Sequence, residues 1–223
     1  DRIFTLGPGQ FYSAEMFTDY PPGFMYVLYL IGALRSLLQI PYYSDLHILL
    51  LKLPAILCDI ACGFLLHREA VKRLHFSDLQ GIFAASAYLF QPAVILNSSC
   101  WGQVDSVYTL MIILMCLFLM KGNLLPAYAV YGLGVLLKPQ MLIFTPVLLT
   151  GIWDHVFLQD FSWRKFFYNL CGGLVVICGM LLLCAPFGLT AAISQYTSTL
   201  GSYEYAAINA YNFWGLLGMN WVD

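Results

Sequence analysis

The chain has 223 residues, of which 61% are hydrophobic and only 10% are charged, and its mean hydropathy is +0.76. Soluble domains carry about 25% charged residues, so this composition excludes an ordinary water-soluble globule. The formal net charge of −2 leaves no basic excess, which argues against a nucleic-acid partner.

Six apolar segments predict an all-α, polytopic membrane protein with about six transmembrane helices, since a bilayer span takes about 20 mostly apolar residues. These segments are 48–66, 82–96, 107–120, 124–137, 141–153 and 166–187. Several are shorter than about 17 residues, so polar flanks must enter the membrane inside the protein, or broken helices must line a cavity. We therefore predict one transmembrane domain over 1–223, with an outer loop and an interfacial helix at 1–47, transmembrane helices at 48–187, and an outer loop at 188–223.

Residues 22–38 are apolar enough to span the membrane, yet they carry Arg35 and lie between two stretches rich in tyrosine and proline. If this segment spans, residues 1–21 lie in the cytoplasm. If it lies along the outer face as an amphipathic or re-entrant helix, the preceding DYPPG sequence at 19–23 joins the other polar motifs outside. We favour the second alternative, because it gathers the ionisable residues that interrupt apolar segments in one place.

Basic residues in the connections predict the orientation of the segments. Those on one side are Arg68, Lys72, Arg73, Lys121, Arg164 and Lys165. The connections of the other side carry mainly Lys138, so the positive-inside rule makes the first set cytoplasmic. The outer side then collects residues 97–106, residues 136–140 and the tail after Phe187.

Lys52 and Asp59 interrupt the first apolar segment, where a charge near the middle of a span costs about 2.5–3.5 kcal/mol. They are seven residues apart, or roughly 10 Å along one helix face, so they point the same way but cannot pair within the helix. Two interpretations stay open. Either each residue pairs with a neighbouring helix, or Lys52 meets a phosphate while Asp59 anchors an adjacent helix.

The stretch NSSCWGQVDS at 97–106 is dense in hydrogen-bonding groups where one span ends and the next begins. Asp105 is placed to cap the next helix, where a carboxylate is also favoured by the helix dipole. Trp101 and Gln103 suit a sugar or a lipid headgroup, because an indole offers a flat apolar face and an amide bonds hydroxyls. Tryptophan is equally common as an interfacial anchor, so that alternative stays open.

Two further proline-containing motifs carry candidate residues. Pro139 disfavours helical geometry at Lys138 and so predicts a break, where Lys138 either meets a phosphate or extends to the headgroups. Gln140 follows in the same motif. In the DYPPG motif, Asp19 lies near a predicted helix start and caps it, positions a substrate, or does both, and Tyr20 is its neighbour.

The motif inventory excludes several kinds of chemistry. No GxxxxGK[ST], HExxH or GxSxG sequence is present, so P-loop, zincin and serine-hydrolase activities lack support. The seven cysteines show no CxxC spacing, and the four histidines share no spacing that predicts a metal site. We therefore predict no metal-binding residues, and the need for a divalent metal stays open.

The order of DYPPG, LKLPAILCD, QPAVILNSSCWGQVDS, LLKPQ and NAYNFWGLLG resembles the multi-spanning glycosyltransferases of the GT-C superfamily. In particular, it is similar to bacterial membrane proteins of the GPI mannosyltransferase II-like family. The resemblance covers most of the chain, and WGQVDS followed by LKPQ is its most specific part. It implies an enzyme that transfers a hexose, in first place mannose, from a polyprenyl-phosphate donor to an acceptor hydroxyl, with inversion. The reaction would take place on the outer face of the bacterial cytoplasmic membrane.

The resemblance also implies that the catalytic acid lies in a first outer loop upstream of Asp1, so we expect an internal part of a longer protein. Asp19 is then, by analogy, a positioning residue. The candidate substrate-binding residues are Asp19, Tyr20, Lys52, Asp59, Trp101, Gln103, Asp105, Lys138 and Gln140. The expected partners are the lipid-linked sugar, membrane lipids, and a glycan, lipid or protein acceptor.

Two other functions stay open at this stage. A multi-pass transporter also uses broken helices and buried charges around a cavity, although no inverted repeat is visible. A non-catalytic membrane subunit would bind a lipid-linked sugar without turning it over.

Overall fold

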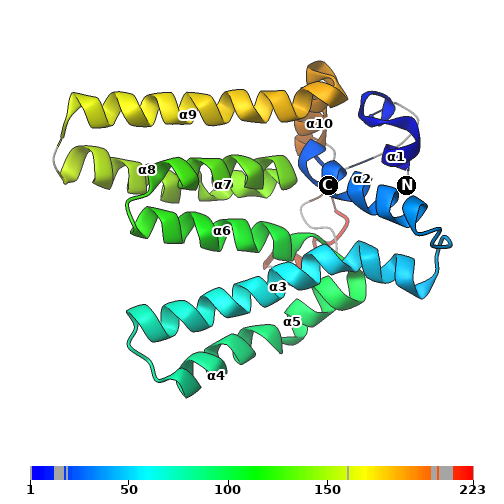
Figure 1. Cartoon of the computed structure of the whole chain (residues 1–223), viewed down its shortest axis with the longest axis horizontal. Coiled ribbons are helices and arrows are strands. Elements are labelled where there is room, and N and C mark those ends of the chain that lie inside the picture. The colour runs from blue at the N-terminus through cyan, green and yellow to red at the C-terminus, as the bar shows by residue number, and fades with distance from the viewer. Residues whose placement is uncertain are drawn as a thin grey trace.

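The computed structural model contains helices and no β-strand within the residues it describes, which are 2–12, 18, 20–159, 161–201, 205 and 213–222. The all-α fold class predicted from the sequence is therefore confirmed for this part of the chain. Figure 1 shows the longer helices lying roughly parallel, so that their connections gather at two opposite ends of the molecule.

The main helices follow one another in an up-and-down order. They are α2 (Pro22–Leu37), α3 (Asp45–Arg73), α4 (Asp78–Leu89), α5 (Pro92–Ile95), α6 (Asp105–Met120), α7 (Leu124–Leu137), α8 (Thr145–Trp153), α9 (Trp163–Cys184) and α10 (Leu189–Gly201). The shorter elements are α1 (Arg2–Leu6), η1 (Pro8–Gln10), η2 (Leu96–Trp101), η3 (Pro139–Phe144), η4 (Asp154–Leu158), η5 (Ala185–Phe187) and α11 (Phe213–Leu216). Of these, η2 and η4 are π-helical.

Three helical stretches in the described part of the chain are long and apolar enough to cross a membrane. They are Asp45–Arg73, Pro139–Leu158 and Trp163–Phe187. A fourth is possible if the helices Asp78–Leu89 and Pro92–Trp101, which are bent by 51° relative to each other, form one broken span. The predicted count of six spans is not confirmed, because α2, α6 and α7 are apolar but only 16, 16 and 14 residues long.

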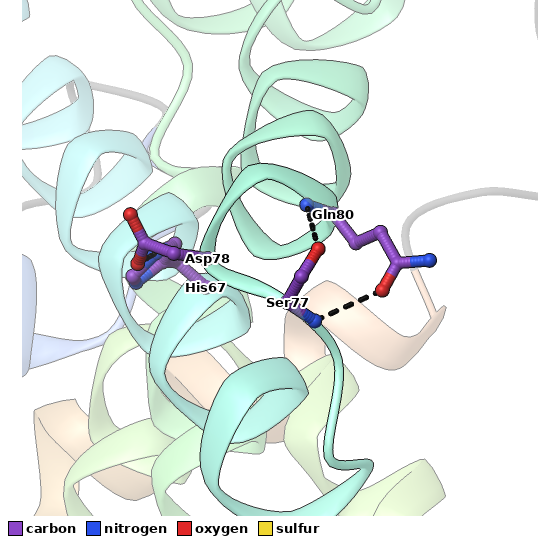
Figure 2. Close-up of polar contacts among 4 residues, drawn as sticks. All are labelled: His67, Ser77, Asp78 and Gln80. Atoms are coloured by element: carbon purple, nitrogen blue, oxygen red, sulfur yellow. Dashed lines mark hydrogen bonds and ion pairs between the residues drawn. The ribbon is translucent and has the colours of Figure 1, made fainter.

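Local sequence signals explain the hairpin of α3 and α4. Ser77 begins α4 with a capping box, in which its hydroxyl accepts from the Gln80 N–H at 3.3 Å and its own N–H donates to Gln80 Oε1 at 2.9 Å. Figure 2 shows this box beside His67 of α3, whose Nε2 lies 3.0 Å from Asp78 Oδ1. These contacts hold the turn at the end of the layer that carries the basic connections.

The core lies between α6, α7, η3 and α8, and the outer face of the long helices is apolar. Buried residues of this core include Met115, Tyr128, Met141 and Leu148. By contrast, only 11% of the apolar window of α9 is buried. An apolar helix that leaves most of its side chains exposed suits a hydrocarbon surrounding, as expected for a membrane protein.

Helix α2 begins at Pro22, as the DYPPG sequence predicts, and crosses α7 at close range. A Cβ atom on Gly23 would lie 2.5 Å from the Leu136 carbonyl oxygen, so only glycine fits this crossing. The crossing brings the beginning of α2 to the end of α7, immediately before the predicted break at Lys138.

We expect Gly23→Ala to destabilise the protein by about 1–3 kcal/mol, because the methyl group would push α2 away from the α7 backbone. Thermal unfolding in detergent would measure the change. Gly179→Ala in α9 is the matched control, since a Cβ there meets nothing within 4 Å and alanine favours a helix. Equal melting temperatures for the two variants would contradict the close α2–α7 contact.

Candidate functional site

An ion pair between Lys138 and Asp105 lies at the centre of the candidate site. Lys138 follows α7 in extended geometry, with φ −153° and ψ 123°, so the break predicted before Pro139 is confirmed. Asp105 begins α6, and its second oxygen accepts from Asn97 Nδ2 at 2.9 Å. Their side chains are 19% and 39% exposed, which leaves the pair accessible from outside the bundle.

The capping role predicted for Asp105 is not what its contacts show. The residue before α6 is Val104, and no side-chain hydrogen bond caps this helix within the described residues. Both oxygens of the Asp105 carboxylate instead bind other side chains, Lys138 and Asn97. The helix dipole still favours a carboxylate in this first turn.

Lys52 reaches the same region from α3. Its Nζ donates to the carbonyl oxygens of Ser99 at 2.9 Å and Cys100 at 2.8 Å, at the end of the π-helix η2. Gly102 follows in left-handed geometry, with φ 81°, and a Cβ there would lie 3.2 Å from Lys52 Cγ. Lys52 therefore pairs with a neighbouring helix, which was one of the two interpretations of its sequence position.

Tyr20 connects the DYPPG segment to the loop before α6. Its hydroxyl donates to Gln103 Oε1 at 2.8 Å, while its carbonyl oxygen accepts from the Tyr12 hydroxyl at 2.9 Å. Burial raises the pKa of the Tyr12 phenol, so this group stays protonated and remains a donor. The contact joins residues 83 positions apart in the sequence.

Asp59 lies deeper along α3 and serves a different contact. It is 5% exposed, and its Oδ1 accepts from the Tyr88 hydroxyl of α4 at 2.9 Å. Two helical turns, or roughly 10 Å, separate it from Lys52 along the helix. Asp59 thus anchors an adjacent helix, as one interpretation expected, and the structure does not bring it to the Lys138–Asp105 pair.

The remaining predicted site residues lie at the edge of the site or outside the described part of the chain. Trp101 is 75% exposed, and Gln140 is exposed in η3, two positions after Lys138. Asp19 and most of the polar tail at 202–212 lie outside the described residues.

Asn97 is the site residue that sequence reasoning did not single out. It lies eight positions before its partner Asp105, across a π-helix and a left-handed glycine, so no regular helical spacing links the two. Its backbone carbonyl also accepts from the Gln103 N–H at 2.9 Å. The signal that could have found it is the density of amide groups before Gly102, because π-helical turns occur frequently at functional sites.

The site and the basic connections lie at opposite ends of the same helices. Helix α3 begins near Lys52 and ends at Arg73, and α6 begins at Asp105 and ends just before Lys121. Figure 1 shows the ends of these helices on opposite sides of the molecule. The sequence prediction that these two sets of residues fall on different sides is thus matched by the direction of both helices.

The site's charges favour an anionic ligand over a metal ion. Lys52 and Lys138 supply two positive charges against the single carboxylate of Asp105, with the amides of Asn97 and Gln103 beside them. Among the described residues, no group of three His, Cys, Asp or Glu side chains could hold a metal ion. Such a cluster of ammonium and amide donors is suited to a phosphate or a sugar hydroxyl.

Comparisons with known protein families, with curated proteins and with solved structures found no match. The resemblance to the GT-C glycosyltransferases therefore stays an expectation from the motifs. The function is argued below from the contacts within the site.

We expect Asp105 and Lys138 to be energetically coupled by about 1 kcal/mol, because either residue alone leaves a half-buried charge without its partner. Asp105→Asn, Lys138→Met and the double variant would be compared by unfolding in detergent. The double variant should lose less stability than the sum of the two single ones. The pair Asp105→Asn and Lys72→Gln, at opposite ends of the bundle, should be additive. Additivity in both cycles would contradict the ion pair.

Proposed function

We propose that the chain forms the donor-binding part of a membrane glycosyltransferase. The enzyme would transfer a hexose, in first place mannose, from a polyprenyl-phosphate donor to an acceptor hydroxyl on the outer face of a bacterial cytoplasmic membrane. The observation that carries the proposal is the convergence of Lys52, Asp105 and Lys138 at one end of a set of apolar helices. A charged headgroup would lie among these residues, while its polyprenyl chain remains in the membrane.

The two lysines supply the charge that the leaving phosphate needs. An ammonium group has three donors, and within the described residues Lys52 uses two of them on carbonyl oxygens and Lys138 uses one on Asp105. Donors therefore remain on both groups. In the reaction, the acceptor oxygen bonds to the anomeric carbon as the bond to the phosphate oxygen breaks, and the phosphate leaves with the electron pair. Lys52 and Lys138 would stabilise the negative charge that develops there.

Asp105 acts in this proposal as a positioning residue that holds Lys138 and Asn97. Gln103 and Tyr20 form a neutral hydrogen-bonding pair that suits sugar hydroxyls, and the exposed indole of Trp101 offers a flat apolar face. The base that takes the acceptor proton stays unassigned, and the resemblance places it upstream of Asp1. Asp19, Asp59 and Gln140 keep their predicted roles as residues to be tested.

A second candidate function is a non-catalytic subunit that binds the lipid-linked sugar. The observation that favours it is that both oxygens of Asp105 are engaged, by Lys138 and Asn97. A carboxylate held in this way is a poor base, so the described site could bind a donor without activating an acceptor.

We expect Lys138→Met to reduce donor consumption by about 10²–10³-fold, because it removes one of the charges that stabilise the leaving phosphate. The purified protein in nanodiscs would be incubated with radiolabelled polyprenyl-phosphate mannose or glucose, and transfer and slow hydrolysis would both be followed. Lys121→Met, at the other end of α6, is the matched control and should keep the full rate. Unchanged turnover in Lys138→Met would remove this residue from the mechanism.

Binding of the same donors separates the two candidate functions. A donor that is bound but never consumed favours the non-catalytic subunit. If neither donor binds, the proposal of a lipid-linked sugar site fails, and a transporter becomes the better explanation of the broken helices.

A further inference from the structure

A second polar pocket lies at the end of the bundle opposite the candidate site. The turn between α6 and α7 meets the segment between α8 and α9 there, around a space of about 650 Å³. Its polar lining includes Asn123, His155, Arg164 and Lys165, and none of the described lining residues is acidic. Gly122 has φ 68°, and a Cβ there would lie 3.2 Å from the His155 ring, so the turn and His155 are close together.

An apolar pocket of about 390 Å³ adjoins it between α7, α8 and α9. Asn169 lines both pockets, and its side chain joins their walls, since Nδ2 donates to the Lys165 carbonyl at 2.8 Å and Oδ1 accepts from the Tyr128 hydroxyl at 3.3 Å. Leu174 lines the apolar pocket and is 53% exposed, so this pocket reaches the outer surface of α9. A basic recess thus continues into an apolar one.

Aromatic rings surround the same end of the bundle. Trp153, Phe157, Phe161 and Trp163 form a series of contacts with ring centroids 4.7 to 5.7 Å apart. Trp163 is 66% exposed immediately before Arg164. Exposed tryptophans of this kind mark the level of the lipid headgroups in membrane proteins, so the basic recess lies at headgroup depth and the apolar pocket at acyl-chain depth.

We propose that the two adjoining pockets form a site for one phospholipid with an anionic headgroup. Its phosphate lies against Arg164, Lys165 and His155, and one acyl chain lies along the apolar pocket beside Gly173. The absence of acidic lining residues in the described pocket selects an anionic over a zwitterionic headgroup, since a zwitterion's cationic part would find no partner. The continuous apolar pocket selects a lipid over free phosphate. The site does not rest on the proposed transferase activity, because it uses none of the residues at the opposite end.

The headgroup half of the site is tested by removing its charge. The purified protein would be delipidated in detergent and given either dioleoyl phosphatidylglycerol or dioleoyl phosphatidylcholine, and the retained lipid would be counted by native mass spectrometry. The unmodified protein should retain one phosphatidylglycerol and release phosphatidylcholine. Arg164→Gln with Lys165→Gln should weaken retention of phosphatidylglycerol at least fivefold. Lys72→Gln with Lys121→Gln removes the same charge at the same end but outside the pocket lining, and should change nothing.

The acyl-chain half is tested by filling the apolar pocket. Gly173 lines this pocket, and a Cβ there meets nothing within 4 Å, so Gly173→Leu should fold and occupy the space of the acyl chain. Retention of phosphatidylglycerol should again fall at least fivefold. Gly179→Leu on the same helix is the matched control, since it has equal free space but lies outside the pocket. Circular dichroism would confirm that both variants keep their helix content.

Three results would overturn the proposal. The first is equal retention of the two lipids by the unmodified protein. The second is full retention of phosphatidylglycerol by both the charge variant and the Gly173→Leu variant. The third is displacement of phosphatidylglycerol by an equal concentration of inorganic phosphate, which would assign the recess to a free anion instead.

Discussion

The ion pair between Lys138 and Asp105 joins a break in the helical chain to the first turn of another helix, and the rest of the candidate site is arranged around it. Pro139 prevents α7 from continuing, which leaves Lys138 extended at a point where its backbone can no longer follow the helix. The carboxylate of Asp105 supplies the partner that this cation needs and binds Asn97 with its other oxygen. One pair therefore fixes the end of α7, the start of α6 and the π-helix between α5 and α6.

The lengths of the helices give this pair its chemical setting. At 1.5 Å per residue, the 16 residues of α6 and the 14 of α7 extend roughly 24 and 21 Å, which is less than the ~30 Å thickness of a hydrocarbon core. The longer helices α3 and α9 can cross that thickness, whereas the short pair ends inside it. Polar groups at the ends of α6 and α7 are then sheltered by longer neighbours, and irregular backbone at such depth needs a protein or water surrounding.

The two ends of the bundle differ in charge because the helices run in alternating directions. One end carries Lys52, Asp105 and Lys138 as mutually paired or bonded groups, and the other carries basic residues in the connections. The apolar surface between them is continuous, as the exposed faces of α3 and α9 show. A lipid-linked sugar at one end and an anionic phospholipid at the other would use the same division into charged ends and an apolar middle.

The sequence by itself determined the all-α class, the membrane character, the break at Lys138 and the placement of two polar motifs on one side. These follow from local properties: apolar runs, the geometry that proline imposes on its predecessor, and the alternation of basic connections. It did not determine the number of spans, because a bend of 51° between Leu89 and Pro92 and the ends of short helices depend on packing against neighbours. Nor did it separate the fates of Lys52 and Asp59, which share a helix face yet bind different elements, η2 and α4. The pairing of Asp105 with Lys138 and Asn97 was decided by the tertiary structure alone, since a contact across 33 positions, or across a π-helical turn, leaves no periodic signal in the chain.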